Sequence, residues 1–329
     1  MAGRRVLVTG VGSYIGTGLA RRLEDHPDFD YVAGLDTRPS RSPLERTELI
    51  EADIRDPVIA TLIAQAEVDT VVHNQIVRQP EPGTSSATMH DINVIGSLQL
   101  LTACERSPSV RSIVIRGSAG IYGSEPAAPQ FFGEEMTRLY PLRTRFQRDI
   151  GEIENYFLTF ARRHPHVTCT MLRYQPAIGP SLETQITRYL SAPVVPTYLG
   201  YDPRLQFVHE DDALDALVAA IRRPVRGAVN VAGPGTIGLT RLVRMAGRPT
   251  LPVPAPLFAS TAGALGRTGL PRLSPDFRNL LRYGRAVDTT RLTEEVGFTP
   301  RYSTPAAALD FVARHAPRGM VPRLKRAVA

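Results

Sequence analysis

Lysine is almost absent from this chain. Of its 39 basic residues, only Lys325 is a lysine, and the other 38 are arginine. A P-loop therefore has no lysine to reach nucleotide phosphates. A bias this strong is more typical of a GC-rich genome than of phosphate binding, and the arginines are scattered rather than arranged in a stripe. The net charge of +7 therefore does not predict a nucleic-acid partner.

Cysteines and long apolar runs are also scarce. Cys104 and Cys169 lie in apolar patterns, which predicts buried free thiols rather than a disulfide. No apolar run approaches the roughly 20 residues that a membrane-spanning helix needs, and the N-terminus does not resemble a signal peptide. The seven histidines are dispersed, which argues against a metal site. We expect a cytoplasmic monomer or homodimer that acts on a small-molecule substrate, with no metal, nucleic-acid or membrane partner.

Short apolar runs alternate with amphipathic helices in the first half of the chain. Strands are expected at 4–9, 31–35, 48–52, 69–73, 111–116 and 167–173, and helices at 14–25, 58–66, 85–105 and 146–163. This alternation predicts an α/β fold: a Rossmann, doubly wound parallel sheet covered on both faces. We assign residues 1–178 to an NAD(P)-binding Rossmann domain. Residues 179–329 form a smaller substrate-binding or lid region, from which segments near 206–232 return to the Rossmann core.

A glycine-rich turn follows the first predicted strand. Gly10, Gly12, Ser13, Tyr14, Ile15 and Gly16 span the junction between this strand and the first helix. Backbone N–H groups and the helix dipole at such a junction bind a pyrophosphate, although a plain strand-to-helix turn is the simpler alternative. Asp36 follows about twenty residues later, where it would accept ribose hydroxyls. Because Arg38 and Arg41 follow Asp36, NAD(H) and NADP(H) are equally compatible with the sequence.

The order of these motifs resembles the extended short-chain dehydrogenase/reductases, the NAD-dependent epimerase/dehydratase-like family. That family's TGxxGxxG turn is matched here at Thr9, Gly10 and Gly16, with Ser13 in place of the middle glycine. The resemblance implies adenine contacts from Asp53 and Ile54, a strand end at Val71–His73 followed by Asn74 and Gln75, and the family's helix asparagine at Asn93. Later segments, including Phe207–Asp212 and Gly297–Pro300, extend the resemblance over nearly the whole chain.

The same resemblance implies a catalytic serine, and it shows that this chain lacks the tyrosine and lysine that the family uses for proton transfer. Ser118 lies at the position of the family's carbonyl-binding serine, although a hydroxyl that merely caps a turn is the alternative. The family's Tyr-x-x-x-Lys pair is replaced by Phe146 and Ile150, and the sole lysine lies too far along the chain to restore it. The residues Tyr122, Arg145, Phe146, Gln175 and Pro176 are expected to line the substrate pocket. Asn74, Gln75, Arg78 and Arg145 are expected at the nicotinamide edge.

Three functions remain open at this stage. The first is an atypical NAD(P)H-dependent ketoreductase that acts on a bulky, polycyclic aromatic metabolite and takes its proton from water or a substrate hydroxyl. It resembles the simocyclinone-type ketoreductases of antibiotic biosynthesis, which lack the Tyr and Lys. The second is a catalytically silent NAD(P)-binding sensor or scaffold. The third is a nucleotide-sugar epimerase or dehydratase, which the missing base disfavours.

Overall fold

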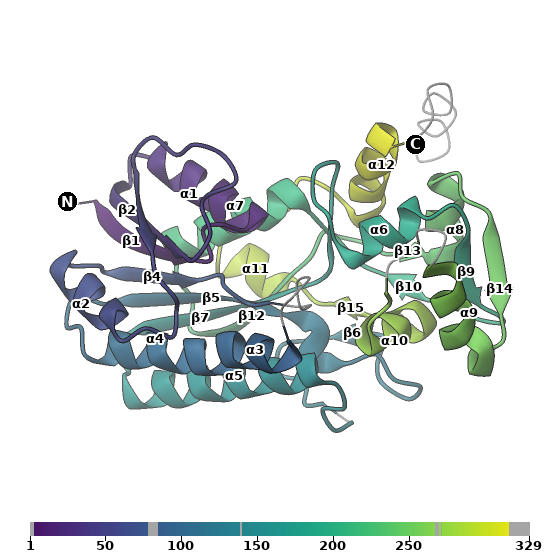
Figure 1. Ribbon diagram of the computed structural model, residues 1–329, viewed down its shortest axis with the longest axis horizontal. Coiled ribbons are helices and arrows are strands. Elements are labelled where there is room, and N and C mark those ends of the chain that lie inside the picture. The colour runs from purple at the N-terminus through teal and green to yellow at the C-terminus, as the bar shows by residue number, and fades with distance from the viewer. Residues whose placement is uncertain (1–2, 78–84, 139, 267–269, 271, 316–329) are drawn as a thin grey trace.

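A seven-stranded sheet forms the centre of the larger part of the molecule (Figure 1). The computed structural model describes residues 3–77, 85–138, 140–266, 270 and 272–315. Every pair of neighbouring strands in this sheet is parallel, and the order is β12-β7-β5-β4-β1-β2-β3. The order reverses between β1 and β4, which creates the crevice where doubly wound folds bind ligands. The predicted α/β Rossmann-like fold is confirmed.

The strands of this sheet are short and mostly apolar. In chain order they are β1 (Arg4–Thr9), β2 (Phe29–Asp36), β3 (Thr47–Glu51), β4 (Thr70–His73), β5 (Ser112–Ser118), β7 (Thr168–Tyr174) and β12 (Gly227–Val231). Val6, Val72 and Val114 lie on one face, whereas Leu7, Val71 and Ile113 lie on the other, and all six are buried. Because the side chains on both faces of the sheet are apolar, both faces have to be covered by helices.

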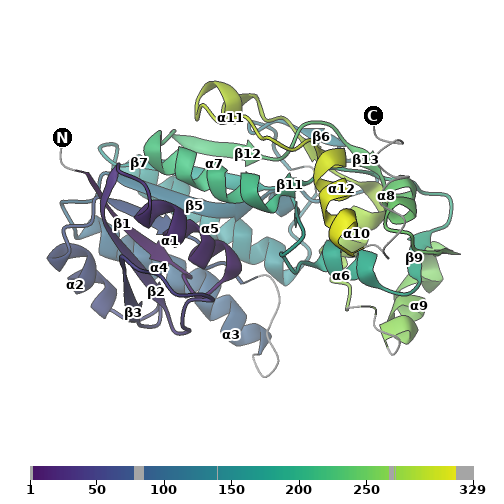
Figure 2. The same cartoon turned by 90° about the horizontal axis from the view of Figure 1, so that it is seen from above.

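Helices supply these two covering layers (Figure 2). The first layer holds α1 (Tyr14–Glu24), α7 (Glu210–Arg222) and α11 (Thr290–Glu294). The second holds α2 (Val58–Gln65), α3 (Ser86–His90), η1 (Asp91–Ile95), α4 (Gly96–Glu105) and α5 (Arg145–Arg163). α7 and β12 therefore complete the sheet unit although they follow residue 178 in the chain.

The remaining elements pack beside the carboxyl edge of the sheet around a separate core that contains Tyr189, Phe207 and Phe258. Its helical elements are α6 (Gln185–Ser191), α8 (Leu239–Met245), η3 (Ala255–Leu257), α9 (Phe258–Leu265), α10 (Pro275–Tyr283) and α12 (Thr304–His315). Its short strands are β8 (Ala177–Ile178), β9 (Val195–Tyr198), β10 (Arg204–Leu205), β11 (Val208–His209), β13 (Ile237–Gly238), β14 (Thr250–Val253) and β15 (Ala286–Val287). β6 (Phe131–Phe132) pairs with β15.

One predicted helix differs from the structure. The single helix expected over 85–105 is divided into α3, η1 and α4, and η1 is a π-helical turn. π-helical turns inside α-helices occur frequently at functional sites. In the part of the chain that the structure describes, no helix has the length and apolar character needed to cross a membrane. Lys325 and Arg78 lie outside the described residues.

Candidate functional site

The turn between β1 and α1 has the glycine conformation and the helix N-cap that the predicted phosphate cradle requires. Gly10 has a positive φ of 73°, and Ser13 is the N-cap of α1, accepting a hydrogen bond from the Gly16 N–H at 3.0 Å. A Cβ on Gly16 would lie 2.0 Å from the Gly10 carbonyl oxygen, so a larger residue there would force the backbone of the turn to shift. At the position of the family's middle glycine, the Ser13 hydroxyl thus caps the helix.

Tyr14 and Ile15 begin α1 with their side chains turned towards protein. Ile15 is buried in the core beneath α1. The Tyr14 hydroxyl forms hydrogen bonds with Glu210 and Ser181, and burial together with the Glu210 carboxylate raises the pKa of Tyr14 to about 12. Tyr14 thus ties α1 to the start of α7.

Asp36 binds the glycine turn at the end of β2. Its Oδ2 accepts a hydrogen bond from the Gly12 N–H at 3.0 Å, and its Oδ1 accepts one from the Arg38 N–H at 3.1 Å. The Arg38 Nε lies 3.6 Å from the same carboxylate. Asp36 is only 3% exposed and holds the glycine turn through these hydrogen bonds, whereas Arg38 is exposed.

Asp53 and Ile54 lie beyond β3, in the segment expected to contact adenine. The Asp53 carboxylate is paired with Arg55 at 2.6 Å, which holds the pKa of Asp53 below its usual range. Ile54 is fully buried, and a Cβ on Gly96 would lie 2.5 Å from its Cγ2. Ile54 therefore packs against the start of α4.

Asn74 and Gln75 follow β4 and lie against the glycine turn. The Asn74 side-chain amide donates to the Gly10 carbonyl at 3.2 Å and to the Ser13 Oγ at 3.1 Å. The Asn74 Oδ1 and the Gln75 Oε1 are buried without a hydrogen-bond partner in the described structure. Buried orphan acceptors beside a glycine cradle fit a ligand that donates hydrogen bonds, such as a ribose.

Asn93 is part of the π-helical turn and does not point freely into the crevice. Its Oδ1 accepts from the Val77 N–H at 2.7 Å, and its Nδ2 donates to the Val77 carbonyl at 2.9 Å and to Asp149 at 3.2 Å. His90 pairs with the other Asp149 oxygen at 2.8 Å. Asn93 therefore acts on the predicted site by fixing the backbone after β4.

Asp149 and His90 were not singled out in the sequence. Asp149 is 1% exposed and lies on the buried stripe of α5, between Phe146 and Ile153. A carboxylate among the apolar residues of a helix face is a readable signal for a buried polar network, and Gln147 and Glu154 are buried on the same helix. Its partners on α3 and η1 depend on the π-helical turn.

Ser118, at the carboxyl end of β5, and Phe146, in the first turn of α5, both lie near Gly120. The Ser118 Oγ caps a short turn, η2 (Ala119–Tyr122), by accepting the Gly120 N–H at 3.1 Å. A Cβ on Gly120 would lie 3.1 Å from this oxygen and 3.9 Å from the Phe146 ring. Ile150, one turn further along α5, is 1% exposed. The Phe146 ring is therefore the apolar neighbour of the turn that follows Ser118.

Tyr122 is buried and hydrogen-bonded within the protein, which differs from its predicted place in the substrate pocket. It is 4% exposed, stacks on Phe132 at a centroid distance of 4.8 Å, and donates its hydroxyl hydrogen to Asn230 Oδ1 at 2.9 Å. Arg173 donates to the same hydroxyl at 2.8 Å and is itself paired with Glu154. These long-range partners place Tyr122 in the interior.

The remaining predicted pocket residues differ in exposure. Arg145 is exposed at the start of α5, and Pro176 is partly buried after β7. Gln175 is 1% exposed, and its side-chain amide is engaged by Arg285, with Nε to Oε1 at 3.4 Å. Burial lowers the pKa of Arg285 to about 10. Arg285 thus links the segment just before β15 to Gln175, which follows the carboxyl end of β7.

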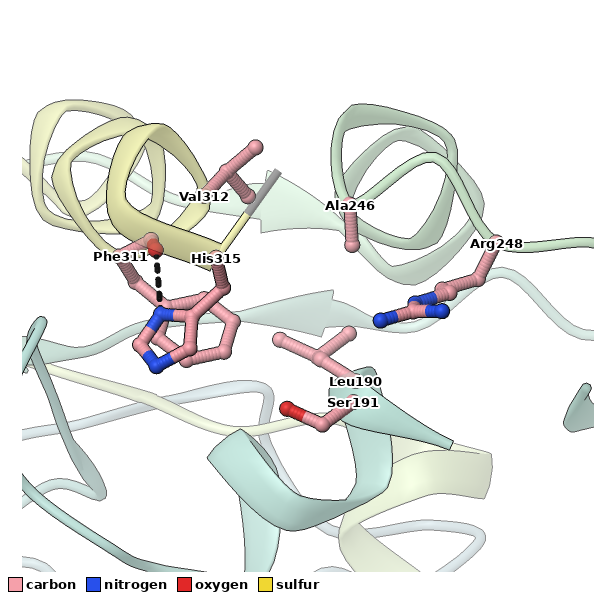
Figure 3. Close-up of a pocket in the computed structure, with 7 residues that line it drawn as sticks. All are labelled: Leu190, Ser191, Ala246, Arg248, Phe311, Val312 and His315. Atoms are coloured by element: carbon pink, nitrogen blue, oxygen red, sulfur yellow. Dashed lines mark hydrogen bonds between the residues drawn. The ribbon is translucent and has the colours of Figure 1, made fainter. Parts of the chain in front are cut away.

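A small cavity lies elsewhere, between α6, α8 and α12 (Figure 3). Its volume is about 10 Å³, at the lower limit for one water molecule. The lining residues are Leu190, Ser191, Ala246, Arg248, Phe311, Val312 and His315. This cavity is too small for a substrate.

Comparisons with known proteins agree with this geometry. Residues 6–232 match the family model described as NAD dependent epimerase/dehydratase family. The uncharacterized protein Rv0501 of Mycobacterium tuberculosis (strain ATCC 25618 / H37Rv) is 38% identical over 312 residues, which cover 93% of this chain and 82% of that protein. The dTDP-4-dehydro-6-deoxy-D-allose reductase of Streptomyces bikiniensis is 23% identical over 329 residues, covering 91% and 93% of the two chains.

Solved structures share the fold at low sequence identity. MoeE5 in complex with UDP-glucose and NAD has a TM-score of 0.72 and 21% identity, covering 99% of this chain and 100% of its own. The dTDP-glucose 4,6-dehydratase from Bacillus anthracis str. Ames, solved with NAD, has a TM-score of 0.71 and 17% identity, covering 95% and 96%. The expected dinucleotide cofactor agrees with the matched family, which is NAD-dependent. The chain belongs to the NAD dependent epimerase/dehydratase family.

Proposed function

We propose that this protein is an NAD(P)H-dependent ketone reductase that works without a proton-transferring tyrosine. The observation that carries the proposal is the pairing of an intact phosphate cradle at Gly10–Gly16 with an apolar Phe146 beside the turn that follows Ser118. The cradle fits a dinucleotide, whereas Phe146 and the buried Ile150 provide neither a proton nor the charge that would activate a tyrosine.

The residues present suit reduction better than epimerisation. A reduced nicotinamide, when bound, supplies the hydride for the carbonyl carbon. Ser118 accepts a hydrogen bond from Gly120, which leaves its own hydroxyl hydrogen to donate to the carbonyl oxygen as negative charge develops there. The alkoxide then takes a proton from water or from an adjacent acidic hydroxyl of the substrate. Epimerisation first needs a base that removes a hydroxyl proton, and Phe146 cannot be that base.

The preferred substrate class is a bulky aromatic ketone with a neighbouring phenol. The Phe146 ring presents an apolar surface next to the turn that follows Ser118, which favours an aromatic substrate over a sugar. A phenol hydrogen-bonded to the reacting carbonyl would also supply the proton that the protein lacks.

A second candidate is reduction of a keto group on a nucleotide sugar. It is favoured by the similarity to the dTDP-4-dehydro-6-deoxy-D-allose reductase over 91% of the chain. It requires the same hydride transfer but a proton from water.

The test is oxidation of NADH and NADPH, followed at 340 nm, with three ketones. These are a polycyclic ketone with an adjacent phenol, its methyl ether, and a dTDP-4-keto-6-deoxy sugar. The proposal expects turnover of the phenol and a much slower reaction of the ether. Turnover of the sugar alone would favour the second candidate, and tight cofactor binding with no turnover of any ketone would favour a sensor or scaffold.

A further inference from the structure

Within the residues that the structure describes, Arg116 near the carboxyl end of β5 has no hydrogen-bond or ion-pair partner. It lies two residues before Ser118 within the run Ser112–Ser118. Its Nε is buried and has no hydrogen-bond partner, and no carboxylate is paired with it in the described part of the chain. Burial lowers the pKa of its guanidinium. An unpaired buried charge destabilises a folded protein, so stability alone does not account for this arginine.

The position of Arg116 in the sheet shows where its side chain lies. Side chains alternate between the faces of a strand, so Arg116 shares a face with Val114 and Ser118. Val114 packs in the same core as Ile15 and Leu19 of α1. Arg116 therefore lies on the side of the sheet that α1 and α7 cover; α7 packs against β5, and α1 begins at the glycine turn.

The glycine turn lies within reach of this side chain. In the sheet, β5 is separated from β1 only by β4, which places β5 roughly 10 Å from β1. His73 of β4 is in register with Ile115 of β5, so the residues that follow them, Asn74 and Arg116, are neighbours. Asn74 in turn contacts the turn through Gly10 and Ser13.

The positive charge of Arg116 and the N-terminus of α1 both favour an anionic ligand at the glycine turn. A dinucleotide places its pyrophosphate on the N-terminus of α1 and then crosses β4 towards β5. Arg116 is partly exposed although its Nε is buried, so its guanidinium is shielded from much of the bulk water without being sealed off from it. A guanidinium in such a place forms strong, charge-assisted hydrogen bonds with phosphate oxygens.

We propose that Arg116 is an anion-binding residue of the cofactor site, which pairs with the pyrophosphate of the dinucleotide from the side opposite the glycine turn. Arg116 thereby adds the positive charge that the backbone cradle lacks. The arginine within the otherwise apolar segment 112–118 was the signal in the sequence.

Calorimetric binding of ADP-ribose tests this proposal, because ADP-ribose carries the pyrophosphate but cannot transfer hydride. Its result is therefore independent of whether the protein proves to be a reductase. We expect Arg116→Gln to weaken ADP-ribose binding roughly ten- to a hundredfold, the range of a hydrogen bond to a charged group. Arg116→Lys, which keeps the charge, is expected to lose less. AMP, with a single phosphate, is expected to be affected less than ADP-ribose.

Arg111→Gln is the matched control, because Arg111 is an exposed arginine just before the opposite end of the same strand. The thermal midpoint of ligand-free Arg116→Gln should equal or exceed that of the wild type, since an unpaired charge is removed. ADP-ribose affinity within twofold of the wild type would overturn the proposal, as would an equal loss in the Arg111 control. Failure of Arg116→Gln to fold would show a structural role and would also contradict it.

Discussion

Mild acid is expected to destabilise this protein through His73. The imidazole is 1% exposed and lies in a chain of hydrogen bonds whose directions are fixed. Ser97 Oγ donates to the Asn93 carbonyl, so it accepts from His73 Nε2 at 2.8 Å. Thr9 Oγ1, which accepts from the Asn74 N–H at 3.2 Å, must then donate to His73 Nδ1 at 3.0 Å. Every hydrogen bond of neutral His73 is thereby made.

A second proton on the His73 ring would disrupt this series of hydrogen bonds. It would place an N–H opposite the Thr9 hydroxyl hydrogen, inside the protein and near the Arg116 cation. Burial, together with Arg116, lowers the pKa of His73 to about 4. Against an unfolded value of about 6.5, this difference corresponds to about 3 kcal/mol, at about 1.4 kcal/mol for each tenfold change.

The sign follows from proton binding. Between pH 6.5 and pH 4 the unfolded state holds the proton and the folded state does not, so stability falls as the pH falls. Stability is fully present above about pH 6.5, and about 2 kcal/mol should be lost at pH 5. Urea unfolding of the wild type at pH 7.5 and pH 5 measures this loss.

His73→Gln serves as the control, because glutamine keeps a donor for Ser97 but does not titrate. Carboxylates that titrate in this range contribute equally to both proteins. The free energy of unfolding of the wild type should therefore fall by about 2 kcal/mol more than that of the variant. Parallel losses in the two proteins would refute the reasoning.

Three further predictions concern the crevice. Phe146→Ala should raise KM roughly tenfold through lost apolar contact and leave kcat nearly unchanged; steady-state kinetics with a large fall in kcat at constant KM would contradict this. Ser118→Ala should lower kcat roughly a hundredfold if the hydroxyl binds the carbonyl oxygen, whereas unchanged kinetics would assign it to the η2 turn alone. Gly16→Ala should weaken NADH binding, measured by fluorescence titration, roughly tenfold or more, because its Cβ meets the Gly10 carbonyl; Gly263→Ala, with no atom within 4 Å, should bind NADH as the wild type does.

The elements of the sheet were readable because burial on both faces leaves a local pattern. The apolar runs at 4–9 and 69–73 appear in the structure as β1 and β4, and the turn between β1 and α1 lies where the glycines predicted it. The absence of a Tyr-x-x-x-Lys pair could be seen from the sequence alone, because Lys325 is the only lysine and Val321 stands four residues before it. These features depend on residues that are close together in the chain.

The features that the sequence did not reveal depend on distant partners. Tyr122 was expected in the substrate pocket, yet its hydroxyl is engaged by Asn230, which lies 108 residues away. The π-helical turn at Asp91–Ile95 shifts the hydrogen bonding of a helix without altering its apolar periodicity. The pairing of Asn93 with Asp149 follows from that turn and was equally hidden.

The position of β12 late in the sequence has a consequence for folding during synthesis. β12 pairs with β7 and supplies Asn230 to Tyr122, but it is synthesised more than fifty residues after β7 ends. Until then, the nascent sheet carries an open edge strand, which is a template for aggregation. A recombinant fragment that stops at residue 178 would keep that edge permanently. The shortest fragment that closes the sheet has to continue through Val231 and carry the intervening segment with it.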